Sequence, residues 1–216
     1  MLYFGKKIVK EVFEVKNITI TIPCANGGTS SSVTVLGLEV EEKDRGELRV
    51  IYEMWVELNK KISRIGGRKV NMPEALSESA FCLEMKRTGY GNPVRAMKVK
   101  GKTPRKYSIS YDTLDKNNYS RQQIKASSID HDLTSFGPRS QQDEIYFLDF
   151  YRDGSFDGKF DVYKIDPQHV DSQVLNIGNN ETFTQQQQEG RRPRLSIKKK
   201  IIERQSLRPL FTGSIF

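Results

Sequence analysis

Residues 107–126 read YSISYDTLDKNNYSRQQIKA and contain two segments in which polar and apolar side chains alternate. In residues 107–112 the apolar side chains occupy the odd positions, and in residues 123–126 Ile124 and Ala126 alternate with polar residues. Such alternation predicts half-buried β-strands. Residues 115–118, DKNN, have the composition of a turn, because Asp and Asn tolerate left-handed dihedral angles. The segment therefore predicts a β-hairpin.

The polar face of this hairpin gathers a carboxylate, an amide and an ammonium group. Because successive side chains of a strand point to opposite faces, Asp112, Gln123 and Lys125 lie on one face. A four-residue loop would put Asp112 opposite Arg121 and diagonal to Gln123, roughly 7–8 Å away between backbones. That separation allows both side chains to reach one cation. The alternative is an ordinary amphipathic hairpin with a solvated polar face.

The composition bounds the class of protein. A chain of 216 residues is long enough for one well-buried domain with a small extra lobe. It has no apolar run long enough to span a membrane, and its first residues lack the pattern of a secretory signal. Cys24 and Cys82 have no CxxC spacing and the histidines are His131 and His169, so a structural zinc site is not expected. We expect a cytoplasmic protein with reduced thiols.

The formal net charge of +8 is concentrated in two runs. Residues 86–106 contain eight Lys or Arg and no Asp or Glu, and residues 185–216 contain eight basic residues against Glu189 and Glu203. Clustered positive charge favours phosphate binding, because neutralised phosphates release condensed counterions. The alternative is a pair of solvated basic segments. Two runs that flank the hairpin favour a nucleic-acid partner.

Two helices are predicted between residues 44 and 85. Asp44-x-x-Glu47 resembles a capping box, and Gly66-Gly67 ends the first helix. The second helix begins near Pro73, and its buried stripe at Leu76, Ala80 and Leu83 leaves Glu78 on another face. The apolar stripe of the first helix consists of Leu48, Ile51, Tyr52, Trp55, Leu58 and Ile62.

The remaining segments favour one α/β sheet domain. Residues 17–22 and 33–40 predict an N-terminal hairpin, and the continuously apolar residues 145–151 predict a strand covered on both faces. Residues 156–165 predict a further strand, and residues 197–205 a helix or strand. We expect a β-rich N-terminal extension in residues 1–43, a main domain in residues 44–205 and a tail in residues 206–216.

The pattern Asp112…Gln123-x-Lys125 resembles the PD-(D/E)xK nuclease motif, with Gln123 where the acidic residue usually stands. Over about residues 45–205 the chain is similar to a family of small type II restriction endonucleases. The segments that carry this similarity, besides the motif, are residues 76–78, 132–138, 146–150 and 190–194.

This resemblance implies an α/β fold with a central mixed β-sheet flanked by helices, restriction-endonuclease-like. The hairpin that alternation predicts in residues 1–43 would add a small N-terminal β-hairpin lobe, in a region where the resemblance is weakest. The resemblance also implies Mg²⁺-dependent hydrolysis of phosphodiester bonds. Asp112 would be the principal metal ligand, completed by the Gln123 side-chain oxygen and the Ile124 carbonyl. Lys125 would orient the attacking water and stabilise developing charge. Glu78 would support the metal site from the preceding helix.

The same resemblance implies double-stranded DNA as substrate, cleaved at a short GC-rich site. Palindromic sites are usually met by two-fold dimers, so we expect a homodimer. We also expect a cognate DNA methyltransferase encoded nearby. The alternatives are a non-catalytic nucleic-acid-binding protein and a repair or junction nuclease. The residues expected to contact DNA are Arg121, Ser135, Arg139, Arg191, Arg192 and Arg194.

Overall fold

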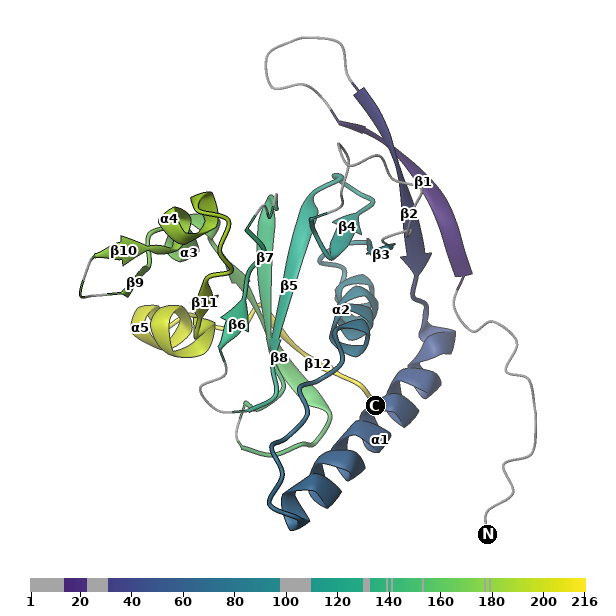
Figure 1. The fold of residues 1–216 in the computed structure, drawn as a ribbon. Coiled ribbons are helices and arrows are strands. Elements are labelled where there is room, and N and C mark those ends of the chain that lie inside the picture. The colour runs from purple at the N-terminus through teal and green to yellow at the C-terminus, as the bar shows by residue number, and fades with distance from the viewer. Residues whose placement is uncertain are drawn as a thin grey trace.

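An eight-stranded mixed sheet lies at the centre of the computed structural model (Figure 1). The structure describes residues 14–22, 31–97, 110–129, 133–138, 140, 142–152, 154–176, 178 and 180–216. The pair β5–β7 is parallel and the other neighbouring pairs are antiparallel. In spatial order the strands are β1 (Glu14–Ile22), β2 (Ser31–Glu39), β3 (Pro93–Met97), β4 (Thr113–Asp115), β5 (Arg121–Ser127), β7 (Glu144–Asp149), β8 (Lys159–Ile165) and β12 (Phe211–Ser214).

Two helices cover one face of this sheet. The 3₁₀ turn η1 (Glu42–Asp44) leads into α1 (Arg45–Arg64), and α2 (Glu74–Thr88) follows. The core on this side joins both helices to the central strands. Its members include Tyr52, Trp55, Leu76, Phe81, Tyr146, Leu148 and Phe160.

A second layer covers the opposite face (Figure 1). It contains α3 (Pro167–Asp171), α4 (Phe183–Gln188), the π-helical turn η3 (Lys198–Ile202) and α5 (Glu203–Gln205). Two short antiparallel pairs join these helices: β6 (Thr134–Ser135) with β11 (Arg194–Leu195), and β9 (Val174–Asn176) with β10 (Glu181–Thr182). The predicted α/β class, with a mixed sheet flanked by helices, is confirmed and is consistent with a restriction-endonuclease-like architecture.

Strand β7 shows why both layers are required. Tyr146 and Leu148 point into the core under α1 and α2, whereas Ile145 and Phe147 point into the core under the C-terminal helices. A continuously apolar strand needs cover on both faces. The prediction of such a strand is therefore confirmed for residues 145–149, while residues 150 and 151 belong to the turn that follows.

The hairpin around the motif forms, but its register differs from the expected one. Residues 116–118 make the turn, and Thr113 pairs with Gln122, which sets Asp112 opposite Gln123 rather than opposite Arg121. The position of the turn decides this register: Asp115 N–H donates to the Ser120 carbonyl at 3.0 Å, so the loop spans residues 116–119 instead of the expected 115–118. Residues 107–109 of the predicted first strand lie outside the described residues.

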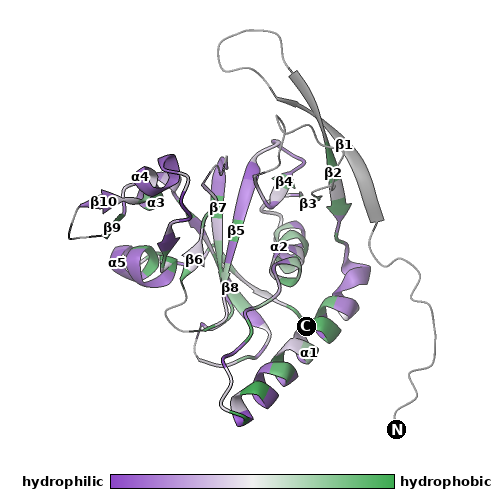
Figure 2. Ribbon diagram, in the orientation of Figure 1, coloured by the Kyte–Doolittle hydropathy of each residue, from purple (hydrophilic) through white to green (hydrophobic). Residues whose placement is uncertain are grey.

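On the polar face of β5, Gln123 is buried and Lys125 is half-buried, so the alternative of a fully solvated polar face is wrong. Figure 2 shows the first half of β5 as hydrophilic, yet Gln122 and Gln123 are buried. Side-chain hydrogen bonds compensate on both faces of the strand. On the polar face Gln123 Nε2 donates to Asp112 Oδ2; on the opposite face Thr113 Oγ1 donates to Gln122 Oε1 at 2.9 Å and Gln122 Nε2 donates to Glu144 Oε2 at 3.0 Å. The layer that contains Phe136 covers the face of Gln123 and Lys125, and alternation within one segment could not reveal this cover.

Helix α1 follows the predicted stripe with two differences. Leu58 is exposed and Asn59 is buried in its place, which extends the row Leu48, Tyr52 and Trp55 at the 3.6-residue period. Asn59 accepts from Val70 N–H at 2.7 Å and so holds the loop that follows the helix. The capping box lies one turn earlier than expected: Asp44 accepts from Glu41 N–H at 2.7 Å.

The predicted N-terminal hairpin is present as β1 and β2, and β2 continues the main sheet by pairing with β3. Within residues 206–216, expected to form a tail, β12 pairs with β8 and the side chain of Ile215 is buried. Among the described residues, no helix has the length and hydrophobicity needed to cross a membrane.

Candidate active site

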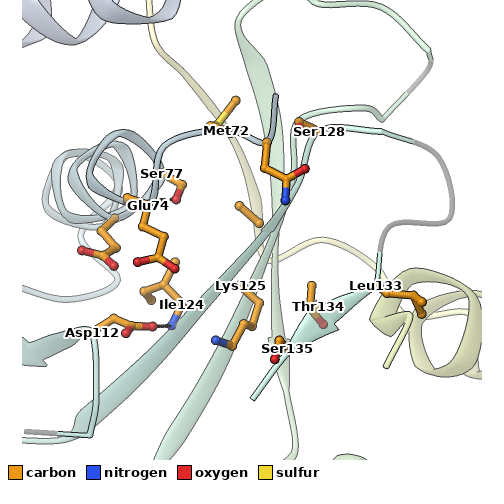
Figure 3. Close-up of a pocket in the computed structure, with 13 residues that line it drawn as sticks. Met72, Glu74, Ser77, Asp112, Ile124, Lys125, Ser128, Leu133, Thr134 and Ser135 are labelled. Carbon is orange, nitrogen blue, oxygen red and sulfur yellow. Dashed lines mark hydrogen bonds between the residues drawn. The ribbon is translucent and has the colours of Figure 1, made fainter. Parts of the chain in front are cut away.

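A cavity of about 230 Å³ opens where β5 passes between α2 and β6 (Figure 3). It brings acidic side chains from α2 together with Asp112 and Lys125 of the hairpin. The residues that line it are Asn71, Met72, Glu74, Ser77, Glu78, Asp112, Ile124, Lys125, Ala126, Ser128, Leu133, Thr134 and Ser135.

Asp112 is fixed by the strand opposite. Its Oδ2 accepts a hydrogen bond from the Ile124 backbone N–H at 2.8 Å and another from Gln123 Nε2. In an antiparallel pair the N–H and C=O of one residue face the same neighbouring strand. The Ile124 carbonyl therefore also faces the side on which Asp112 lies. Gln123 itself is buried beside Asp112 and does not line the cavity.

Two glutamates reach the cavity from α2. Glu74 and Glu78 are four residues apart, so they share one helix face. Arg95 of β3 donates to Glu78 Oε2 at 2.9 Å. Burial and, to a smaller extent, the negative charge of Asp112 together raise the pKa of Glu78 to about 7, against the opposing effect of Arg95. Glu78 and Asp112 line the same cavity, so two carboxylates face one space.

Lys125 supplies the positive charge of the site. Its Nζ lies 5.0 Å from the ring centre of Phe136, which belongs to the covering layer. Burial lowers the pKa of Lys125, while Asp112, Glu74 and Glu78 act in the opposite direction. A lysine held between carboxylates and an aromatic ring can donate hydrogen bonds to a water or a phosphate oxygen that enters the cavity.

The expected DNA-contacting residues separate into two groups. Ser135 lines the cavity, and Arg194 pairs with it across β6 and β11. Arg192 is exposed, and its charge lowers the pKa of Lys125, so it lies near the site. These three residues therefore gather around the cavity.

The other expected contacts are engaged elsewhere or lie outside the described residues. Arg191 forms ion pairs with Glu181 and, at 2.6 Å, with Glu189. Arg121 is paired with Asp143 at 2.6 Å and does not line the cavity. Arg139 lies outside the described residues, as does His131.

Sequence reasoning missed Glu74, Ser77 and Thr134. The sequence did contain a signal for Glu74: it lies four residues before Glu78, and residues four apart share a helix face. Thr134 had no local signal. Its Oγ1 donates to the Leu195 carbonyl at 2.8 Å, across 61 residues of sequence.

The side chains fit a hard divalent cation. Carboxylates and a backbone carbonyl are the oxygen donors that Mg²⁺ prefers, and this ion usually keeps several waters and needs one or two carboxylates. Within the described part of the chain no group of three or more His, Cys, Asp or Glu side chains is placed to hold a metal. Asp112, Glu78 and Glu74 are carboxylates that line the cavity, and a cation bound there would offset the cost of burying the charge of Glu78 beside Asp112.

Glu78 should make folding stability pH-dependent when divalent cations are absent. Its pKa rises from 4.5 to about 7 on folding, so its contribution is fully present below pH 4.5 and is lost as the pH rises through 7. We expect a loss of ~3 kcal/mol in the free energy of unfolding. Glu78→Gln should flatten this dependence, whereas Glu57→Gln, at an exposed position on α1, should not. Urea denaturation between pH 4.5 and 8 measures the free energy of unfolding as a function of pH. Identical profiles for wild type and Glu78→Gln would contradict this prediction.

Comparisons with known proteins identify the family to which the chain is similar. A family model described as the Bsp6I restriction endonuclease matches residues 40–204. The chain is similar to the type II restriction enzyme Bsp6I of Bacillus sp. (strain RFL6), with 30% identity over 162 residues. That alignment covers 74% of this chain and 81% of the relative. No solved structure matches.

Proposed function

The chain belongs to the Bsp6I restriction endonuclease family and is a site-specific deoxyribonuclease; we propose that it hydrolyses double-stranded DNA with Mg²⁺ at a short GC-rich site. The observation that carries the mechanism is the convergence of Asp112, Glu78 and Lys125 on one cavity. The GC-rich preference rests on the sequence resemblance. We place the protein in the cytoplasm, where such a substrate is met.

In this mechanism the carboxylates bind the metal and the lysine acts on the reacting groups. Asp112 would hold Mg²⁺ together with Glu78 and the Ile124 carbonyl. The bound cation supplies Lewis-acid stabilisation of charge on the phosphate and favours deprotonation of the attacking water. Gln123 donates to Asp112, so it acts as a positioning residue rather than as a ligand through its oxygen. This role replaces the direct ligand role expected for Gln123.

Lys125 would hold the water in line with the phosphorus and stabilise the charge that develops on the phosphate oxygens. Partial burial strengthens this interaction, because screening by solvent is weaker inside the cavity. Ser135 and Arg192, at the border of the cavity, would contact the phosphate backbone on either side of the bond that is cut.

Incubation with phage DNA tests the proposed function. With Mg²⁺ we expect discrete bands, with the same set of sizes in every digestion. With EDTA we expect intact DNA. Sequencing of the fragment ends would then give the recognition site. A continuous smear, or cutting that requires branched rather than linear DNA, would contradict site-specific cleavage.

We propose a homodimer that forms through the outer face of α1. Val50, Met54 and Leu58 occupy successive turns of this helix and expose 47%, 67% and 47% of their surface. An antiparallel two-fold pairing centred on Met54 would set Val50 against Leu58 of a second copy. It would also set Glu47 against Lys61, which have opposite charges. This self-complementarity favours a second copy of the chain as the occupant of the face.

The substitution Met54→Glu should convert this dimer to a monomer, because it brings two like charges together at the symmetry axis. Light scattering coupled to size-exclusion chromatography measures the mass. Lys60→Glu, on the same helix but off the stripe, is the control and should remain a dimer. A monomeric wild-type protein, or a Met54→Glu variant of dimeric mass, would contradict this interface.

We also propose that a cognate DNA methyltransferase is encoded nearby. A site-specific nuclease threatens the DNA of its own cell at every copy of its site, so a modification of that site must protect it. Digestion of genomic DNA from the source cell tests this expectation. Resistant genomic DNA that becomes sensitive after amplification in vitro would support it, and sensitive native DNA would contradict it.

A further inference from the structure

A second groove lies beside the catalytic cavity and shares one wall with it. It has a volume of about 680 Å³ and is lined by Leu133, Ser196, Lys199, Lys200, Glu203 and Arg204. Leu133 belongs to both the groove and the catalytic cavity, so the two are neighbours on the surface. The groove is formed mainly by η3 and α5, which lie beside β6 and β11 (Figure 1).

The charges of this groove suit an anion. Lys199, Lys200 and Arg204 contribute three positive charges against the single carboxylate of Glu203. The preceding residue, Lys198, has a different role, because its Nζ is paired with Asp149 at 2.7 Å. The lysines that follow it line the groove instead.

Ser196 provides a second and independent indication of a ligand. It is 8% exposed and lines the groove, and its Oγ is a buried atom without a hydrogen-bond partner in the described part of the chain. Leaving a buried hydroxyl unpaired is unfavourable, and such groups are uncommon in native proteins. A phosphate oxygen in the groove would accept the hydrogen bond that Ser196 can donate.

We propose that this groove binds a backbone phosphate of the DNA strand that is cleaved, at a nucleotide beside the scissile bond. The inference rests on the proposed function, because a polymeric substrate with one phosphate in the catalytic cavity extends beyond it, and the groove adjoins the cavity at Leu133. Ser196 donates a hydrogen bond to the phosphate, and Lys199, Lys200 and Arg204 neutralise it. The site therefore contributes affinity and strand position, not sequence recognition.

Equilibrium binding to a DNA duplex without divalent cations tests the groove separately from cleavage. Ser196→Ala should weaken binding about tenfold, because a hydrogen bond to a charged group is lost. The double variant Lys199→Gln and Lys200→Gln should reduce the slope of log K against log [salt] by roughly 1–2. Glu203→Gln should strengthen binding, since it removes the opposing carboxylate. A double variant at Lys60 and Lys159, exposed lysines away from the groove, is the matched control.

The outcomes separate this proposal from the proposed function. If the wild-type protein cuts DNA into discrete bands but the groove variants keep wild-type affinity and salt slope, the groove proposal is overturned alone. If the wild-type protein gives no site-specific cutting, the proposed function fails whatever the groove variants do. Inorganic phosphate distinguishes a free anion from DNA. In a third outcome, phosphate raises the melting temperature of the wild-type protein but not that of Ser196→Ala, while the two proteins bind DNA equally well. That result would assign the groove to free phosphate and overturn the DNA proposal.

Discussion

Replacement of Lys125 by Ala should lower the rate of DNA cleavage by about 10²–10⁴-fold. The ammonium group of Lys125 is the positive charge that the cavity places beside Asp112 and Glu78, and burial makes its interactions strong. Removing it leaves the carboxylates intact but removes the group that stabilises developing charge on the phosphate. Cleavage should be followed as single-turnover decay of a duplex that contains one recognition site.

DNA affinity separates a chemical role of Lys125 from a structural one. Lys125→Ala should bind DNA within a few-fold of wild type, because the basic residues outside the cavity supply most of the phosphate contacts. Lys159→Ala, at an exposed position on β8, should retain wild-type cleavage. Undiminished cutting by Lys125→Ala would remove this residue from the mechanism.

Replacement of Asp112 by Asn should abolish both cleavage and metal binding. Wild-type protein should be stabilised by Mg²⁺, by about 2.7 kcal/mol when the ion is present at about 100 times its Kd. Asn has the same shape as Asp and its side-chain oxygen can still accept the hydrogen bond from Ile124 N–H, but it lacks the negative charge that holds the cation. The stabilisation by Mg²⁺ should therefore disappear in Asp112→Asn.

Thermal denaturation with and without Mg²⁺ measures this loss without relying on activity. Asp171→Asn, at an exposed position at the end of α3, provides the control for removal of one carboxylate. Equal stabilisation of wild type and Asp112→Asn would show that the cation is held elsewhere in the protein.

The sequence alone predicts those features that local pattern controls. The period of α1, the glycine pair that follows it, the start of α2 near Pro73 and the apolar strand β7 each depend on residues close in sequence. The same holds for the association of Asp112 with β5, because alternation places Asp112 and Gln123 on one face. Residue type and spacing were sufficient for these features.

Features that depend on distant segments could not be predicted. The register between Asp112 and Gln123 depends on the position of the turn, and the cover over the polar face of β5 depends on Phe136 in a separate layer. The groove beside the cavity joins Leu133 to Ser196 only because β6 pairs with β11. Neither Ser196 nor its neighbours have a sequence pattern that sets them apart from an ordinary basic helix.

The position of β12 at the edge of the sheet has a consequence for the biosynthesis of this protein. Strand β8 carries buried apolar residues and is paired on its outer side only by residues 211–214. Until that segment has left the ribosome, the nascent chain displays an open apolar edge, which is a template for aggregation. Interrupted translation products that lack β12 should therefore be recovered in inclusion bodies, and the nuclease would reach its working form only after residues 211–214 have been made.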